Sequence, residues 1–133
     1  MIRSPLPDVG QVARSTLSMN DIDLVAEAFR HASVALMGFQ NQPRANAGAD
    51  LTPGGEIIAD MSAWLAEHAD LIAGAAVTLQ PANPADAEQR AWVLLRRAVE
   101  MHDDLFETAA LGARMLVEVR GAEWIERRQR RAA

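Results

Sequence analysis

The sequence predicts an all-α protein that folds as an antiparallel helical bundle of three main helices. Apolar residues recur three or four positions apart over most of the chain, which is the period of one helix face. Breaks that contain proline divide this pattern into three long segments. No stretch alternates apolar and polar residues in the way that predicts a half-buried strand.

Length and composition favour one packed domain. The chain has 133 residues, of which 50% are hydrophobic and 23% are charged. The absence of cysteine excludes disulfides and cysteine-ligated metal sites. The absence of lysine excludes Schiff-base chemistry and a Walker-type phosphate site. A net charge of -5 argues against a surface made for nucleic acid.

We expect a cytoplasmic protein from a bacterium whose GC-rich genome favours alanine and arginine codons. Residues 1–18 contain no uninterrupted apolar segment of the kind that begins a secretory signal. They carry Pro5 and Pro7 without a sustained period, and they are expected to form a flexible N-terminal arm. The longest apolar run, residues 71–79, is too short to span a bilayer.

A bundle domain is expected over residues 19–120, and its first helix begins at Asn20. Asn20 and Asp23 have the form of a capping pair. The helix should end before Gln42-Pro43, because proline disfavours helical geometry in the residue that precedes it. The expected buried face consists of Ile22, Val25, Phe29, Ala32, Leu36 and Phe39.

The second helix is expected to begin at Thr52-Pro53, after a loop over residues 43–51. Threonine is a good cap, and proline is favoured in the first turn, where its missing N–H is not needed. Two apolar stripes run side by side along this helix, so it is expected to be the central one. The first stripe consists of Ile57, Met61, Trp64, His68, Leu71 and Ala75, and the second of Ile58, Leu65, Ile72, Ala76 and Leu79.

The third helix is expected to begin at Asn83-Pro84, directly after a short turn that makes it an antiparallel neighbour of the second helix. We expect this helix to be long and to end at Gly121. The pattern also allows a bend near His102 or Gly112. Asp104 could instead cap a fourth helix, but no Gly or Pro is present there to reverse the chain. The expected buried face consists of Trp92, Leu95, Val99, His102, Phe106, Ala109, Ala113 and Leu116.

One histidine falls on each expected helix, namely His31, His68 and His102. Bundles can build metal or small-ligand sites from such residues, and this use of the core histidines is one alternative function. However, no Glu-x-x-His pair is present, and His68 and His102 would differ by about 9 Å in height at ~1.5 Å per residue. We therefore expect core or boundary histidines, and no metal or cofactor.

Two catalytic uses of histidine are conceivable from the sequence, and each lacks a feature that it needs. His102 beside Asp103 and Asp104 could act as a general base, but consecutive helical residues diverge by about 100°. His31 could serve as a phosphorelay histidine, although the lysine and glycine that usually follow such a residue are missing. No catalytic motif is recognisable, so we expect a protein that is not an enzyme.

A basic helical tail is expected over residues 121–133. From Arg120 onward the chain carries five arginines and two glutamates. Arginines beside an aromatic residue can bind an acidic protein face or phosphates, so the tail is the candidate partner-binding site and a nucleic-acid-associated role is a second alternative. The candidate residues are Trp124, Ile125, Arg127, Arg128, Arg130 and Arg131.

Small residues such as those of Gly74-Ala75-Ala76 allow helices to approach closely, but they bury little apolar area. A long third helix would also leave apolar surface uncovered by two shorter helices. Both features predict a homodimer in which the helices complete a larger bundle. The expected function is that of a non-enzymatic interaction or regulatory module that binds another protein.

Overall fold

The structure is a computed structural model, and it describes residues 17–101 and 104–133. These residues are mostly helical, which confirms the all-α prediction. The α-helices are α2 (Met19–Gln40), α3 (Pro53–Gly74), α4 (Pro84–Glu100) and α5 (Leu105–Ala132). Short 3-10 helices η1 (Pro43–Ala45) and η2 (Ala75–Val77) and the two-residue strands β1 (Asn46–Ala47) and β2 (Asp50–Leu51) complete the elements.

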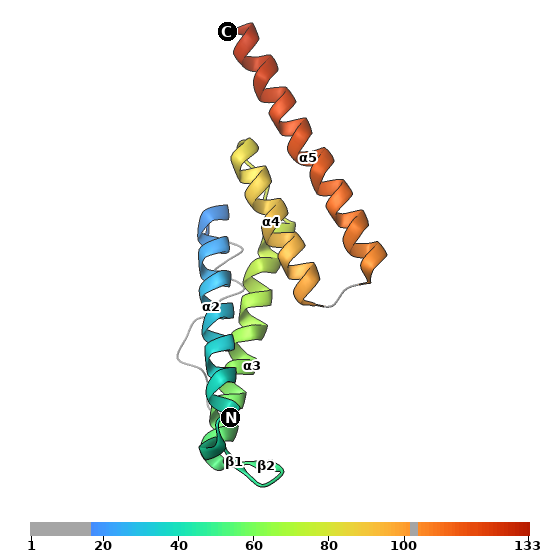
Figure 1. Ribbon diagram of the computed structural model, residues 1–133. Coiled ribbons are helices and arrows are strands. Elements are labelled where there is room, and N and C mark those ends of the chain that lie inside the picture. The colour runs from blue at the N-terminus through green and yellow to red at the C-terminus, as the bar shows by residue number, and fades with distance from the viewer. Residues whose placement is uncertain (1–16, 102–103) are drawn as a thin grey trace.

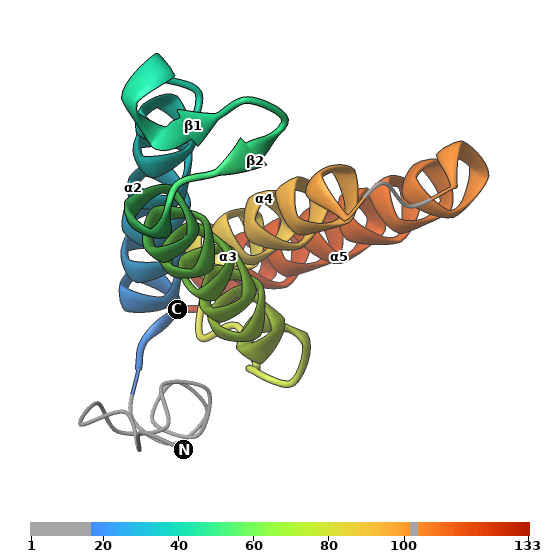
Figure 2. The ribbon, with the colours of Figure 1, turned by 90° about the horizontal axis from the view of Figure 1, so that it is seen from below.

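The helices form two hairpins that differ in how well each is covered. Helices α2 and α3 lie side by side along their length, and α4 packs against both of them. Helix α5 packs chiefly on α4, and its C-terminal end projects beyond all the other helices (Figure 1). Seen from below, the C-terminal end of α4 and the N-terminal end of α5 point away from the α2–α3 pair (Figure 2). None of the helices in the described segments therefore lies against the other side of α5.

Local capping explains where the helices begin. Thr52 caps α3 by accepting a hydrogen bond from the Gly55 amide, and Asn83 caps α4 in the same way, each with proline in the first turn as predicted. Helix α2 begins one residue earlier than expected, because Ser18 and Asp21 form a capping box. The predicted Asn20 pair is therefore wrong.

The loop between α2 and α3 contains a small hairpin that the sequence pattern did not predict. Strands β1 and β2 pair antiparallel, and Gly48 makes the turn between them with a φ of 67°. The chain then returns so closely that a Cβ on Gly55 would lie 2.2 Å from the Ala45 carbonyl oxygen. Only glycine fits where the loop meets the first turn of α3.

The prediction of one long third helix is wrong. Helix α4 ends at Glu100 with Met101 as its C-cap, and α5 begins after Asp104, whose carboxylate accepts a hydrogen bond from the Phe106 amide. The alternative with a fourth helix is the one observed. Helix α5 also continues through Gly121, which was expected to end it.

Alanine dominates the buried core. Among the described residues, the only large side chains with almost no exposed surface are Ile22 and Ile72. Ile72 and Ala76 of the second predicted stripe are buried in this core, whereas Ile57 and Met61 of the first stripe are exposed. Trp92 was also expected in the core and is exposed. The remaining buried apolar residues include nine alanines, namely Ala26, Ala45, Ala69, Ala73, Ala75, Ala76, Ala87, Ala91 and Ala98.

Helices α2 and α3 are joined by a reciprocal pair of serines. The Ser33 hydroxyl donates to the Ser62 carbonyl oxygen at 2.9 Å, and the Ser62 hydroxyl donates to the Ser33 carbonyl oxygen at the same distance. Both side chains are buried. Small side chains let the two backbones approach closely enough for these contacts, which helps to fix the register of the pair.

Arginines of α4 connect this helix to each of the others. Ion pairs join α4 to α2, to α3 and to α5, so the polar residues of α4 fix the two hairpins relative to each other. The pairs are Arg96 with Asp23, Arg30 with Glu100, Arg97 with Asp70 and Arg90 with Glu118.

A candidate protein-interaction surface

The side of α5 that faces away from α4 carries large apolar residues in contact with solvent. Phe106 is 82% exposed, Val117 is 73% exposed and Trp124 is 57% exposed. Exposed apolar residues are ordinary when scattered, but a continuous row of them marks an association surface. We call this row the outer face of α5, and it consists of Phe106, Ala110, Ala113, Val117, Arg120 and Trp124.

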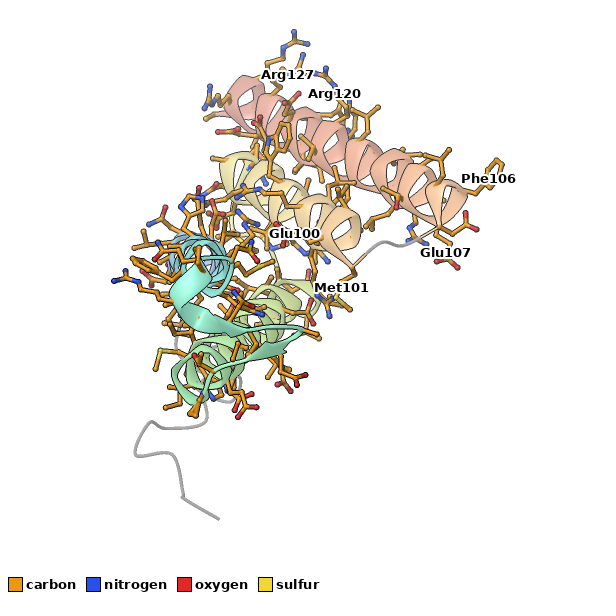
Figure 3. The ribbon with its side chains drawn as sticks, turned by 60° about the horizontal axis from the view of Figure 1, so that its bottom comes forward. Glu100, Met101, Phe106, Glu107, Arg120 and Arg127 are labelled. Atoms are coloured by element: carbon orange, nitrogen blue, oxygen red, sulfur yellow. The ribbon has the colours of Figure 1, made fainter. Side chains whose placement is uncertain are left out.

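The direction of the outer face follows from helix geometry. Met115 is the buried residue of α5 and points towards α4. Phe106 and Trp124 each lie nine positions from Met115, which is about two and a half turns at ~3.6 residues per turn. Both side chains therefore point in the opposite direction. Figure 3 shows Phe106, Arg120 and Arg127 projecting from α5 on the side away from α4.

The spacing along the outer face is that of a coiled-coil seam. Its six positions follow one another at intervals of four, three, four, three and four residues. Such a pattern keeps one side of a helix turned towards a partner helix over successive heptads. Arg120 is the single charged residue within the row.

The arginines near the C-terminus are mostly engaged within α5. Glu123 pairs with Arg120 and with Arg127, and Arg130 pairs with Glu126. The Arg128 guanidinium lies over the Trp124 ring at 5.2 Å from its centroid. Two glutamates thus pair with three of the five arginines from Arg120 onward, and the segment keeps a surplus of three positive charges.

Two of the grooves that border α5 flank its C-terminal half. One of about 770 Å³ lies between the α3–α4 connection and the last turns of α5, and Leu79, Pro81 and Ile125 contribute apolar walls. The other, of about 420 Å³, is lined by residues of α4 and α5 such as Leu95 and Leu116. Trp124 and Ile125 thus face different sides of α5, although the sequence grouped them as one site.

The histidines do not converge in the described part of the chain. The His68 ring stacks on Trp64 and its Nδ1 lies 2.8 Å from the Trp64 carbonyl oxygen. His31 is exposed beside Glu27 at 3.8 Å. Within residues 17–101 and 104–133, no three histidine or carboxylate side chains lie close enough to hold a metal ion. His102 and Asp103 lie outside the described residues.

The chain matches no family model, no curated protein and no solved structure. None of the helices in the described segments has both the length and the apolar character needed to cross a membrane.

The sequence pattern located part of this surface. Trp124 was named as a docking residue because it lies in a polar setting. The sequence pattern predicts Phe106 in the core, because the prediction of one long helix puts all of its periodic apolar residues on a single face. The intervals of four and three residues from Phe106 to Trp124 were present in the sequence and could have indicated a seam.

Proposed function

We propose that this chain is a non-enzymatic, cytoplasmic helical interaction module that binds another protein chain through the outer face of α5 and works as a homodimer. The observation that carries the proposal is the row of apolar side chains, from Phe106 to Trp124, that no other described helix covers. Burying such a row against a second helix is the usual way in which amphipathic helices recognise proteins.

The imbalance between core and surface supports the proposal. The core is built mainly from alanines, whereas the described residues include seventeen large apolar side chains that are exposed. Such a chain gains little from burial within itself and much from burial against a partner. Aromatic and arginine side chains, which concentrate binding energy in protein interfaces, occur together at Trp124 and Arg128.

The alternatives suggested by the sequence have less support. A metal or ligand site would use His31, His68 and His102, but His68 is engaged with Trp64 and His31 lies at the surface. A nucleic-acid role would use the arginines from Arg120 onward, but three of these five pair with glutamates of the same helix and the whole chain carries a net charge of -5. Protein binding uses the features that these alternatives leave unexplained.

The proposal can be tested in the native host with a tagged chain expressed beside the untagged one. Val117→Asp places a charge at the middle of the outer face, where a partner helix would have to bury it. We expect the wild-type chain to retain a stoichiometric protein partner, identified by mass spectrometry, and the V117D chain to lose it.

Val34→Asp is the matched control, because Val34 is 61% exposed on α2 and lies outside the outer face of α5. This variant should retain the partner, and circular dichroism should show both variants to be equally helical. Retention of the partner by V117D, or a wild-type chain that carries no protein at stoichiometric level, would refute the proposal.

A further inference from the structure

We infer that the helix received by the outer face of α5 is α5 of a second copy of this chain, and that the two helices run antiparallel. This inference rests on the proposed function, because it names the occupant of that surface and its direction. It follows from three properties of α5, which are the sizes of the side chains in the outer face, the placement of the arginines and the open side of the helix.

The side-chain sizes match when the two copies run in opposite directions. If Phe106 of one copy lies level with Trp124 of the other, the intervals place Ala110 level with Arg120 and Ala113 level with Val117. Large residues then lie opposite small ones in the central part of the contact, and the two aromatic residues meet at each end. Interdigitation of this kind allows close helix packing without cavities.

A parallel pair would place each residue opposite its own copy. Ala110 and Ala113 would then face alanines and leave voids, whereas Arg120 would face Arg120. The same intervals continue through Arg127 and Arg131, so two further pairs of like charges would lie within the seam. Cavities and like charges both destabilise an interface.

The helix dipoles also favour the antiparallel direction. Antiparallel pairing sets the dipoles of the two α5 helices in opposite directions, which is favourable for neighbouring helices. The charges at the helix ends do not select a direction, because Asp104 and Glu107 lie level with Glu126 and Glu123 of the other copy in this register, and Arg130 and Arg131 extend past its α5.

The fold leaves room for such a pair. Helix α4 covers the opposite side of α5, and α2 and α3 lie beyond α4 (Figure 1). The outer face extends over eighteen residue steps from Phe106 to Trp124, or ~27 Å at ~1.5 Å per residue. This is about three heptads, near the length at which a heptad pattern becomes sufficient for pairing.

Disulfide trapping tests the direction directly, because the chain has no cysteine of its own. Two single-cysteine chains, Ala110→Cys and Arg120→Cys, are prepared in the full-length protein. In the antiparallel pair position 110 lies level with position 120 of the other copy, while like positions are ~15 Å apart in height at ~1.5 Å per residue. Thiols that far apart cannot be bridged.

Mild oxidation of an equimolar mixture should therefore give the A110C–R120C disulfide dimer, and each variant alone should give little dimer. A chain with Ala28→Cys on the exposed side of α2 is the control, which should not cross-link to either variant. Light scattering of the cysteine-free wild type should show a dimer, and Val117→Asp should weaken dimerisation by at least about 30-fold, since the substitution acts in both copies.

If each variant alone forms a disulfide dimer and the mixture gives no A110C–R120C disulfide, the pair is parallel and the inferred direction is wrong. A wild-type chain that is monomeric at tens of micromolar would refute the α5 pair itself. A monomer would also refute the homodimer of the proposed function, whereas a parallel pair would leave the proposed function standing; binding of a different protein in the native host is decided by the loss or retention of that protein in V117D. The two proposals can therefore fail separately.

Discussion

Arg90 joins η2, α4 and α5 at one point, which makes it the most informative residue to change. Its Nε donates to the Ala76 carbonyl oxygen at 2.7 Å and its Nη2 donates to the Val77 carbonyl oxygen at 3.0 Å. Its Nη1 lies 2.7 Å from both carboxylate oxygens of Glu118. Arg90→Met keeps an unbranched apolar stem, ends where the guanidinium begins, and removes all of these bonds.

The expected loss of stability follows from these contacts. Removing one member of a fully buried ion pair costs about 3–5 kcal/mol. The Arg90 side chain is only 13% exposed, but Glu118 is 34% exposed and can regain water, so the loss is smaller than in a fully buried pair. The carbonyl groups of Ala76 and Val77 also lose a charged donor, at about 1.5 kcal/mol or more for each such bond. We expect a total of about 4–6 kcal/mol, of which the two carbonyl bonds supply about 3 kcal/mol and the partly exposed ion pair the rest.

Urea unfolding followed by circular dichroism at one fixed protein concentration measures this loss, because a self-associating chain gains stability with concentration. Glu118→Gln should cost less than Arg90→Met, since Arg90 keeps its bonds to the two carbonyl groups. The double variant should be less destabilised than the sum of the single variants by about 1 kcal/mol. An Arg90→Met protein within ~0.5 kcal/mol of the wild type, or strictly additive effects, would show that the guanidinium does not couple the helices.

Further stability measurements address the close contacts of α2 and α3. Ser33→Ala should lower the free energy of unfolding by about 1 kcal/mol, and adding Ser62→Ala should cost about as much again, because each hydroxyl donates to the backbone carbonyl oxygen of the other residue and that acceptor remains in both variants; a double variant as stable as the single one would contradict this. Gly55→Ala should destabilise by about 2–3 kcal/mol, since its Cβ would meet the Ala45 carbonyl oxygen at 2.2 Å. Gly38→Ala in α2, where a Cβ meets nothing within 4 Å, should instead stabilise by about 0.5–1 kcal/mol. Equal effects at the two glycines would disprove the steric explanation.

The sequence was a good guide to helix starts and a poor guide to where the third segment divides. Thr52 and Asn83 cap as predicted, because a cap acts through hydrogen bonds to residues three positions away. Asp104 also has the form of an N-cap. Because no glycine or proline lies nearby, the sequence nevertheless predicted one continuous helix there. The packing of α5 on α4, which includes the Arg90–Glu118 pair, favours a reversal that local composition does not indicate.

Gly121 shows the opposite error. Glycine in a helix interior costs about 1 kcal/mol relative to alanine. For this reason Gly121 was expected to end the helix. Good helix formers on both sides, together with the pairs of Glu123 with Arg120 and Arg127, support continuation of α5. The basic residues consequently belong to the same helix as Phe106 and Val117.

The amino-acid sequence by itself determined the all-α class, the breaks at Gln42-Pro43 and Gln80-Pro81, and the apolar period of each helix. All of these depend on interactions between residues a few positions apart. Tertiary structure decided which of two overlapping stripes is buried on α3, why Trp92 is exposed, and which side of α5 is left open. A helical period fixes which residues share a face, but only the positions of the neighbouring helices decide which face loses contact with water.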